Sequence, residues 1–231
     1  MTLSNSYQGF LKVLPNFNGI PALLLRLYLG PVFIMAGISK TQLYSEEVTG
    51  FMSIMADPNI INWFGNTEWG LGLPFPALLA NLVVIVELFG GILLLFGALT
   101  RLISIPLMFT MIIAATTVHA QNGWFAITPT NADISPAQVL NIVGIEQAQE
   151  SLNNSEATRK KLTVIRELLE EHGNTQWLYE NGNVVILNNG IEFSATYFIM
   201  LLALFFLGGG RYTSIDHLIV KRYLTVKRSF T

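Results

Sequence analysis

Residues 76–101 read PALLANLVVIVELFGGILLLFGALTR, and this stretch decides what kind of fold the chain can adopt. Between Pro76 and Leu99 the only charged side chain is Glu87, near the middle. An α-helix rises ~1.5 Å per residue, so this part reaches ~36 Å and can cross a hydrocarbon core of ~30 Å. A carboxylate is costly in lipid and usually faces a bundle interior or a polar cavity. The stretch therefore predicts a membrane span whose acidic residue packs against other helices.

One face of this predicted helix combines charge with small residues. Residues three or four apart share a helix face. The set that recurs at this spacing is Glu87, Gly90, Gly91, Leu94, Gly97, Ala98 and Arg101. Small residues let membrane helices approach one another closely. We therefore expect other helices to pack tightly against this face, and a group elsewhere in the chain to partner Glu87.

Composition also indicates a membrane protein. The chain has 231 residues, of which 52% are hydrophobic and 12% are charged, and its mean hydropathy is +0.49. Soluble domains average about 25% charged residues. The net charge of -2 argues against a nucleic-acid partner. The absence of cysteine excludes disulfides, thiolate metal sites and cysteine nucleophiles.

Three further apolar stretches predict spans, at 20–39, 102–118 and 193–207. The first has a face with a cation near each end and glycines between them. Its residues are Arg26, Gly30, Phe33, Gly37 and Lys40. These two cations either face the interior or snorkel to the interfaces. His119 follows directly after the span predicted at 102–118.

The connecting segments differ in character. Residues 1–19 are polar with several aromatics, which predicts an interfacial segment or a frayed terminus rather than a signal peptide. The 41–75 loop is acidic and aromatic, as expected at a membrane–water interface. The 126–190 insert contains two helical patterns, up to about 152 and over 155–171. Asn181-Gly182 then predicts a β-hairpin there.

We therefore predict an all-α membrane protein, a four-transmembrane-helix bundle with a small extracytoplasmic α+β insert between helices 3 and 4. The predicted parts are the interfacial segment 1–19, helices 1–3 with their outer loop over 20–125, the insert 126–190, and helix 4 with a basic tail over 191–231. The 41–75 loop contains no Lys or Arg, whereas Lys12, Arg101 and the tail are basic. The positive-inside rule then places both termini in the cytoplasm. Asp216, among the basic residues of this end, is expected to be a capping or interface acid.

Four motifs in order resemble the DoxX family. They are Arg26-x3-Gly30-x2-Phe33-x3-Gly37-x2-Lys40; Glu87-x2-Gly90-Gly91 with Gly97-x3-Arg101; His119-x3-Gly123; and Gly208-Gly209-Gly210-x4-Ile215-Asp216. The resemblance covers about 20–130 and 191–220. It implies a four-helix, multi-pass protein of the prokaryotic inner membrane. Members are named after a small subunit associated with a terminal quinol oxidase, and relatives take part in thiosulfate:quinone oxidoreduction. The insert at 126–190 is longer than the outer loop expected in a minimal member.

The ionisable residues suggest a quinone site rather than a metal site. The three histidines are too far apart in the sequence pattern to share a haem, so no intrinsic metal or cofactor is expected. We expect Glu87 and His119 to act as the catalytic pair, exchanging a proton with a quinone and donating to it. The residues expected to bind the cofactor are Arg26, Lys40, Gly90, Gly91 and Arg101. Electrons have to come from a partner oxidoreductase subunit.

Two other interpretations stay open. The charges can instead be structural, as an internal ion pair that fixes helix register in a membrane anchor or assembly protein. The protein can also be a small-solute transporter. Four spans are few for a transporter, so this interpretation requires a homo-oligomer.

Overall fold

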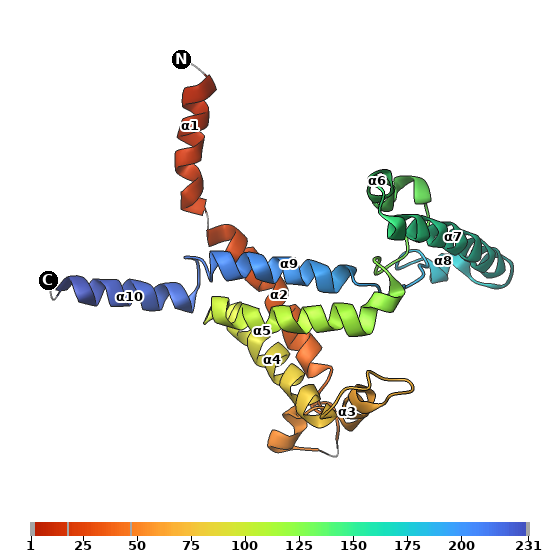
Figure 1. Cartoon of the computed structure of the whole chain (residues 1–231), viewed down its shortest axis with the longest axis horizontal. Coiled ribbons are helices and arrows are strands. Elements are labelled where there is room, and N and C mark those ends of the chain that lie inside the picture. Colours follow the sequence, from red (N-terminus) through yellow and green to blue (C-terminus); the bar gives the residue numbers. More distant parts are fainter. Residues whose placement is uncertain (1–2, 18, 47, 230–231) are drawn as a thin grey trace. The chain divides into compact units, whose positions relative to one another are not determined.

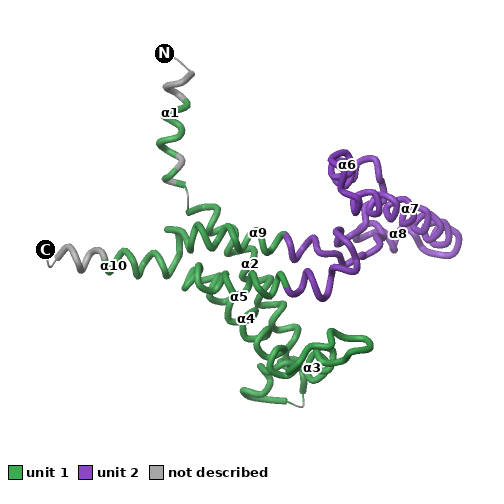
Figure 2. The backbone as a smooth tube through the Cα atoms, viewed as in Figure 1, with its two compact units in different colours: residues 1–112, 196–231 green, residues 113–195 purple. Residues whose placement is uncertain are grey.

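The computed structural model describes residues 3–17, 19–46 and 48–229, and most of these residues are helical. Pairing of extended backbone among these residues is limited to two isolated bridges, Thr41 with Ala56 and Ile127 with Leu187. The chain forms two compact units (Figure 2). One contains residues 1–112 and 196–231, and the other contains residues 113–195.

Three helices of the described chain are long and apolar enough to cross a membrane (Figure 1). They are α2 (Gly19–Ile38), α4 (Pro76–Phe96) and a helix from Thr100 to Asn122. The last consists of α5 (Thr100–Ile113), a π-helical turn (Ala114–His119) and a 3₁₀ turn (Ala120–Asn122). The fourth apolar helix, α9 (Glu192–Leu207), has 16 residues. It therefore reaches only ~24 Å, so helix length does not support the predicted count of four spans.

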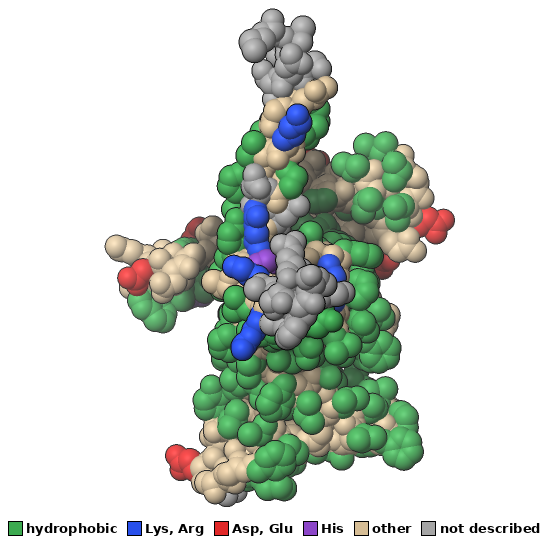
Figure 3. All heavy atoms as spheres, turned by 90° about the vertical axis from the view of Figure 1, so that its left-hand side faces the viewer, with side chains coloured by type: hydrophobic (Ala, Val, Ile, Leu, Met, Phe, Trp, Pro, Cys, Tyr) green, Lys and Arg blue, Asp and Glu red, His purple; other side chains and the backbone are tan. Residues whose placement is uncertain are grey.

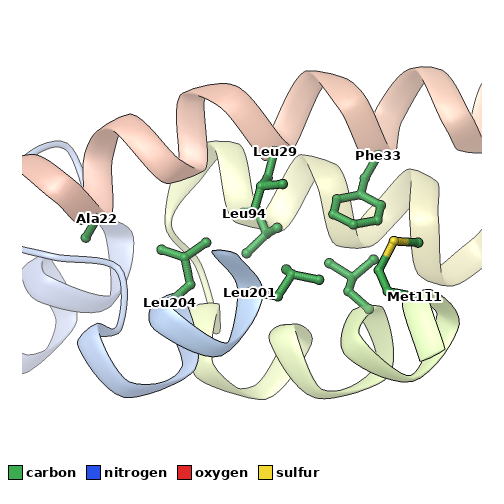
Figure 4. Close-up of a cluster of buried hydrophobic side chains, with 8 residues drawn as sticks. Ala22, Leu29, Phe33, Leu94, Met111, Leu201 and Leu204 are labelled. Carbon is green, nitrogen blue, oxygen red and sulfur yellow. The ribbon is translucent and has the colours of Figure 1, made fainter. Parts of the chain in front are cut away.

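The core of the first unit draws on four helices. Its buried side chains come from α2, α4, α5 and α9, and several of them converge in Figure 4. They are Ala22, Leu29, Phe33, Leu94, Leu107, Met111, Leu201 and Leu204. Although α9 is short, its last two turns are thus part of the same core as the three longer helices.

Helices α2 and α4 pack closely and antiparallel. A Cβ added at Gly37 would lie 2.7 Å from the backbone nitrogen of Leu88. One added at Gly91 would lie 2.7 Å from the nitrogen of Ile34. Since only hydrogen fits at these positions, the prediction of tight packing against a glycine face is confirmed.

The 41–75 segment covers the N-terminal half of α4. It contains a 3₁₀ turn (Gly50–Ile54) and α3 (Pro58–Gly65), which Asp57 caps by accepting from Asn59 N at 2.7 Å. Ala56 and Phe64 of this segment form a second apolar cluster with Ala80 and Val84 of α4. C-terminal to these contacts, from Leu88 onward, α4 packs against α2.

The span predicted over 76–99 is shorter than expected, because α4 ends at Phe96 with Gly97 in the left-handed conformation (φ 62°). Leu99 also has a positive φ of 51°, and α5 begins at Thr100. Arg101 therefore belongs to the first turn of α5. The prediction that Arg101 shares a helix face with Glu87 is wrong.

The insert is helical, and its predicted hairpin is wrong. It contains a 3₁₀ turn (Ala132–Ile134), α6 (Ala137–Ile142), α7 (Glu146–His172) and α8 (Thr175–Leu178). Asn174 caps α8 by accepting from Trp177 N at 3.2 Å, so the first predicted strand is a helical turn. Leu187 pairs with Ile127 rather than with a hairpin partner.

The predicted break between the two insert helices is also misplaced. α7 continues without interruption through residues 153 and 154, because a buried stripe at three- and four-residue spacing crosses them. Its members are Ala148, Leu152, Ser155, Thr158 and Leu162. The break lies instead at Gly144, whose φ is +85°.

The two ends of the chain are helical as well. Residues 3–17 form α1 (Leu3–Val13) and a 3₁₀ turn (Leu14–Phe17), and α10 spans Ile215–Ser229. The interfacial location of 1–19 stays a prediction, and Met1, Thr2 and Asn18 lie outside the described residues.

Candidate intramembrane polar site

Glu87 forms an ion pair with Lys40 inside the first unit. The Lys40 Nζ lies 2.6 Å from Glu87 Oε2 and also donates to the carbonyl of Ala36 at 3.0 Å. Glu87 is only 4% exposed, whereas the Lys40 side chain is 26% exposed. Glu87 lies ~16 Å along α4 from its first residue. The acidic residue of the decisive stretch thus has the basic partner that its burial requires.

The pair does not use all of its hydrogen-bonding groups. An ammonium has three N–H donors, and Lys40 uses two of them. Within the described residues, Oε1 of Glu87 accepts no hydrogen bond, and the third N–H of Lys40 has no acceptor. One donor and one acceptor therefore remain side by side at a partly exposed position.

The 41–75 segment is tied to Lys40 and to α4 by two hydrogen bonds. The nitrogen of Asp57 donates to the carbonyl of Lys40 at 2.9 Å. The nitrogen of Ala56 donates to Oδ1 of Asn81, on α4, also at 2.9 Å. Sequence reasoning did not single out Asn81, although an amide within an apolar helix is a signal that could have identified it.

Arg26 forms a different kind of polar cluster. Its side chain is fully buried, and its guanidinium makes five hydrogen bonds at 2.6–3.3 Å, all to backbone carbonyls. The acceptors are Leu94, Leu95, Gly209, Tyr212 and Thr213. The first two belong to the last turn of α4, where the Leu94 carbonyl also accepts from Gly97 N at 2.9 Å. Because a guanidinium has five N–H donors, Arg26 is saturated by the protein itself.

The backbone around Arg26 is shaped to admit the guanidinium. A Cβ at Gly97 would lie 2.5 Å from the Arg26 Cζ. The carbonyl of Gly97 accepts from Ser214 Oγ at 3.0 Å and from Asp216 N at 2.9 Å. The Asp216 carboxylate in turn accepts from the nitrogens of Leu99 and Thr100, at 2.7 and 2.9 Å. This confirms that Asp216 is a capping acid, at the start of α5.

The other predicted site residues have neighbours of their own. Gly90 faces α5, since a Cβ there would lie 3.2 Å from Ile103 and Leu107 side chains. Gly91 faces α2, and Arg101 lies beyond the C-terminal end of α4. His119 belongs to the second unit, where its Nδ1 lies 2.8 Å from the carbonyl of Asn189. Of the predicted set, the structure brings together Lys40 and Glu87; the assigned binding and catalytic roles stay predictions.

These features define the class of protein. Apolar side chains of the long helices are exposed outward, among them Leu24, Leu78, Leu82, Phe89, Leu102 and Phe109, while Arg26 and Glu87 are buried. Such a distribution is that of a helical protein with lipid as its solvent. The molecule is a multi-pass integral membrane protein.

Comparison with known proteins gives the family. Residues 22–120 match the family model described as DoxX, and this part of the chain includes α2, the ion pair, α4 and α5. This match supports the DoxX assignment that the motifs predict, and the motif at 208–216 lies outside the matched residues. No curated protein and no solved structure matches it.

Proposed function

We propose that the protein is an accessory membrane subunit of a quinone-linked oxidoreductase, with the Lys40–Glu87 pair as the site for a quinone headgroup. The observation that supports this is the incomplete hydrogen bonding of a buried ion pair. A pair that serves only structure is expected to satisfy its remaining donors and acceptors internally. Here one N–H of Lys40 and Oε1 of Glu87 stay available.

The two free groups are complementary to a quinone headgroup. Lys40 would donate its remaining N–H to a carbonyl oxygen of the oxidised form. Glu87 Oε1 would accept from a hydroxyl of the reduced form and take its proton. The bound quinone supplies the redox chemistry, and the electrons come from or go to a partner oxidoreductase subunit.

The proposal includes a four-span topology. Leu201 and Leu204 of α9 lie in the same core as residues of α2, α4 and α5, which supports α9 as the fourth span despite its length. A short apolar helix is accommodated by local thinning of the bilayer. With four spans, both termini lie on one side, which the basic tail assigns to the cytoplasm of a prokaryotic inner membrane.

A purification with quinone analysis tests the headgroup site. We expect wild-type protein isolated in mild detergent to retain quinone. The double variant Lys40→Met/Glu87→Met should bind quinone about tenfold more weakly, which corresponds to ~1.4 kcal/mol of binding free energy. The double variant is chosen because it removes both charges together and so leaves no unpaired ion in the membrane. Lys160→Gln, on an exposed face of α7, serves as the control. Equal quinone content in all three proteins would exclude the site.

The second candidate function is a non-catalytic anchor or assembly protein. The saturation of Arg26 favours it, because this arginine ties the ends of α4 and α9 together without any free donor. The same purification separates the two functions. A co-purifying oxidoreductase whose quinone content does not respond to the double variant would identify the anchor.

A further inference from the structure

A second polar site lies in the first unit, where α9 ends and α5 begins. A cavity of about 540 Å³ is lined there by residues of α5, α10 and the glycine turn that follows α9. Its polar groups include Arg101 and His217, and its apolar walls include Leu102, Leu207 and Val220. None of these residues belongs to the Lys40–Glu87 site.

Arg101 is the cation of this cavity. Its Nη2 donates to the carbonyl of Phe206, in the last turn of α9, at 3.1 Å. Gly208, with a φ of +74°, is the first residue after α9, and a Cβ there would lie 3.2 Å from the Arg101 Nε. The glycine therefore leaves room for the guanidinium beside the turn. In the described chain the other N–H groups of Arg101 have no acceptor, in contrast to those of Arg26.

Asp216 lines the same cavity but does not neutralise Arg101. Its two carboxylate oxygens accept from the nitrogens of Leu99 and Thr100. Its charge is thereby offset by the positive end of the α5 dipole. No salt bridge between Asp216 and Arg101 is found among the described residues. The guanidinium is thus free to bind an external anion in the fork geometry that suits phosphate.

The surroundings indicate an amphiphilic ligand. Leu102, Leu207 and Val220 are 63%, 45% and 55% exposed, although they line the cavity. The cavity lies at the end of α9 and the start of α5, and the ends of membrane spans are where lipid headgroups are found. Figure 3 shows Lys and Arg side chains gathered on the face that looks along α10, with hydrophobic side chains over much of the surface. Basic pockets between membrane helices bind the headgroups of anionic lipids.

We propose that this cavity binds the phosphate of an anionic phospholipid, with Arg101 as the phosphate ligand and the leucine and valine walls against the glycerol and acyl chains. The site is independent of the quinone proposal, since it uses other residues and another ligand.

Native mass spectrometry of the full chain in detergent, with added phosphatidylglycerol, tests the site. We expect Arg101→Gln to weaken phosphatidylglycerol binding about tenfold, as the loss of one charge-assisted contact predicts. Arg222→Gln, which removes an exposed cation from α10 outside the cavity, is the matched control and should leave binding unchanged. Val220→Glu should weaken binding as well, because it places an acid in the cavity wall.

Two further arms separate the sources of phosphate. Phosphatidylcholine should bind more weakly than phosphatidylglycerol and be insensitive to Arg101→Gln, because its choline cancels the headgroup charge. Inorganic phosphate should not compete with the lipid at equal concentration. Competition by inorganic phosphate, or equal effects of Arg101→Gln and Arg222→Gln, would overturn the proposal. If Arg101→Gln unfolds at the same temperature as wild type, its weaker lipid binding is not caused by misfolding.

Discussion

The two charged clusters of the membrane unit differ in how completely the protein satisfies them. Arg26 places all five of its N–H donors on backbone carbonyls and is fully buried. Lys40 and Glu87 meet at 2.6 Å but keep one donor and one oxygen free, and Lys40 remains partly exposed. Arg26 belongs to α2 and Glu87 to α4, whereas Lys40 lies in the turn that follows α2. The protein therefore saturates one cluster itself, whereas the other keeps the donor and the acceptor on which the proposed headgroup site depends.

The largest expected effect is at the saturated cluster. Arg26→Met removes the donor of five carbonyls, of which Leu95, Gly209 and Thr213 have no other hydrogen-bond donor among the described residues. Since each buried orphan costs about 1–3 kcal/mol, we expect a loss of ~4 kcal/mol or more in the free energy of unfolding. Arg26→Lys should recover less than half of that, because an ammonium has three donors and no planar fork. Denaturant unfolding in detergent micelles measures both.

Arg211→Met is the control for this prediction. Arg211 lies on the same turn but is exposed and makes one long hydrogen bond, 3.4 Å to the carbonyl of Pro15. Its replacement should change the unfolding free energy by less than ~1 kcal/mol. If Arg26→Lys proved as stable as wild type, saturation would not be what holds the ends of α4 and α9.

The next effect concerns the open cluster and is expected to be asymmetric. Lys40→Met leaves a carboxylate that is only 4% exposed without its cation, at a cost of ~3 kcal/mol. Glu87→Met leaves Lys40, whose partly exposed ammonium can snorkel to the interface, so ~1 kcal/mol is expected. The double variant should return close to the wild-type unfolding free energy, because apolar groups replace both charges.

A double-mutant cycle measures this coupling. If the destabilisation of the double variant equals the sum of those of the two single variants, Lys40 and Glu87 do not interact in the membrane. A stable double variant that has lost quinone, by contrast, would separate the functional from the structural contribution of the same pair.

The sequence predicted the framework well because its strongest signals are local. The charge-poor run around Glu87 and the glycine spacing of 30, 37 and 91 predicted the spans and their close packing. The pairing of Glu87 with a cation followed from the cost of burying a carboxylate. Which cation it would be could not be decided, because Arg26 and Lys40 lie on the same face of the first helix.

The parts that failed depend on contacts between segments. Arg101 fits the helical spacing of Glu87, but Gly97 and Leu99 adopt positive φ values that end α4 first. The carbonyls that bind Arg26 come from residues 94, 95, 209, 212 and 213, and no sequence pattern marks a backbone acceptor. In the insert, Asn181-Gly182 is a good local hairpin signal, yet Leu187 pairs with Ile127. Local preference was overridden there by a partner distant in the sequence.

The smallest expected effect tests how firmly the 41–75 segment is held over the open cluster. Asn81 is the side chain of α4 that accepts from the nitrogen of Ala56, and Ala56 precedes the residue whose nitrogen binds the Lys40 carbonyl. Asn81→Ala removes one neutral hydrogen bond, worth ~1 kcal/mol. We therefore expect about fivefold faster hydrogen exchange at the Ala56 amide and little change in global stability. Asn59→Ala, on the exposed side of α3, should leave that amide unaffected. If Asn81→Ala also increased the off-rate of bound quinone, the segment would be the barrier that retains the headgroup. Unchanged exchange at Ala56 would show that the segment is fixed by the Asp57–Lys40 hydrogen bond and the apolar contacts of Phe64 and Val84, and not by Asn81.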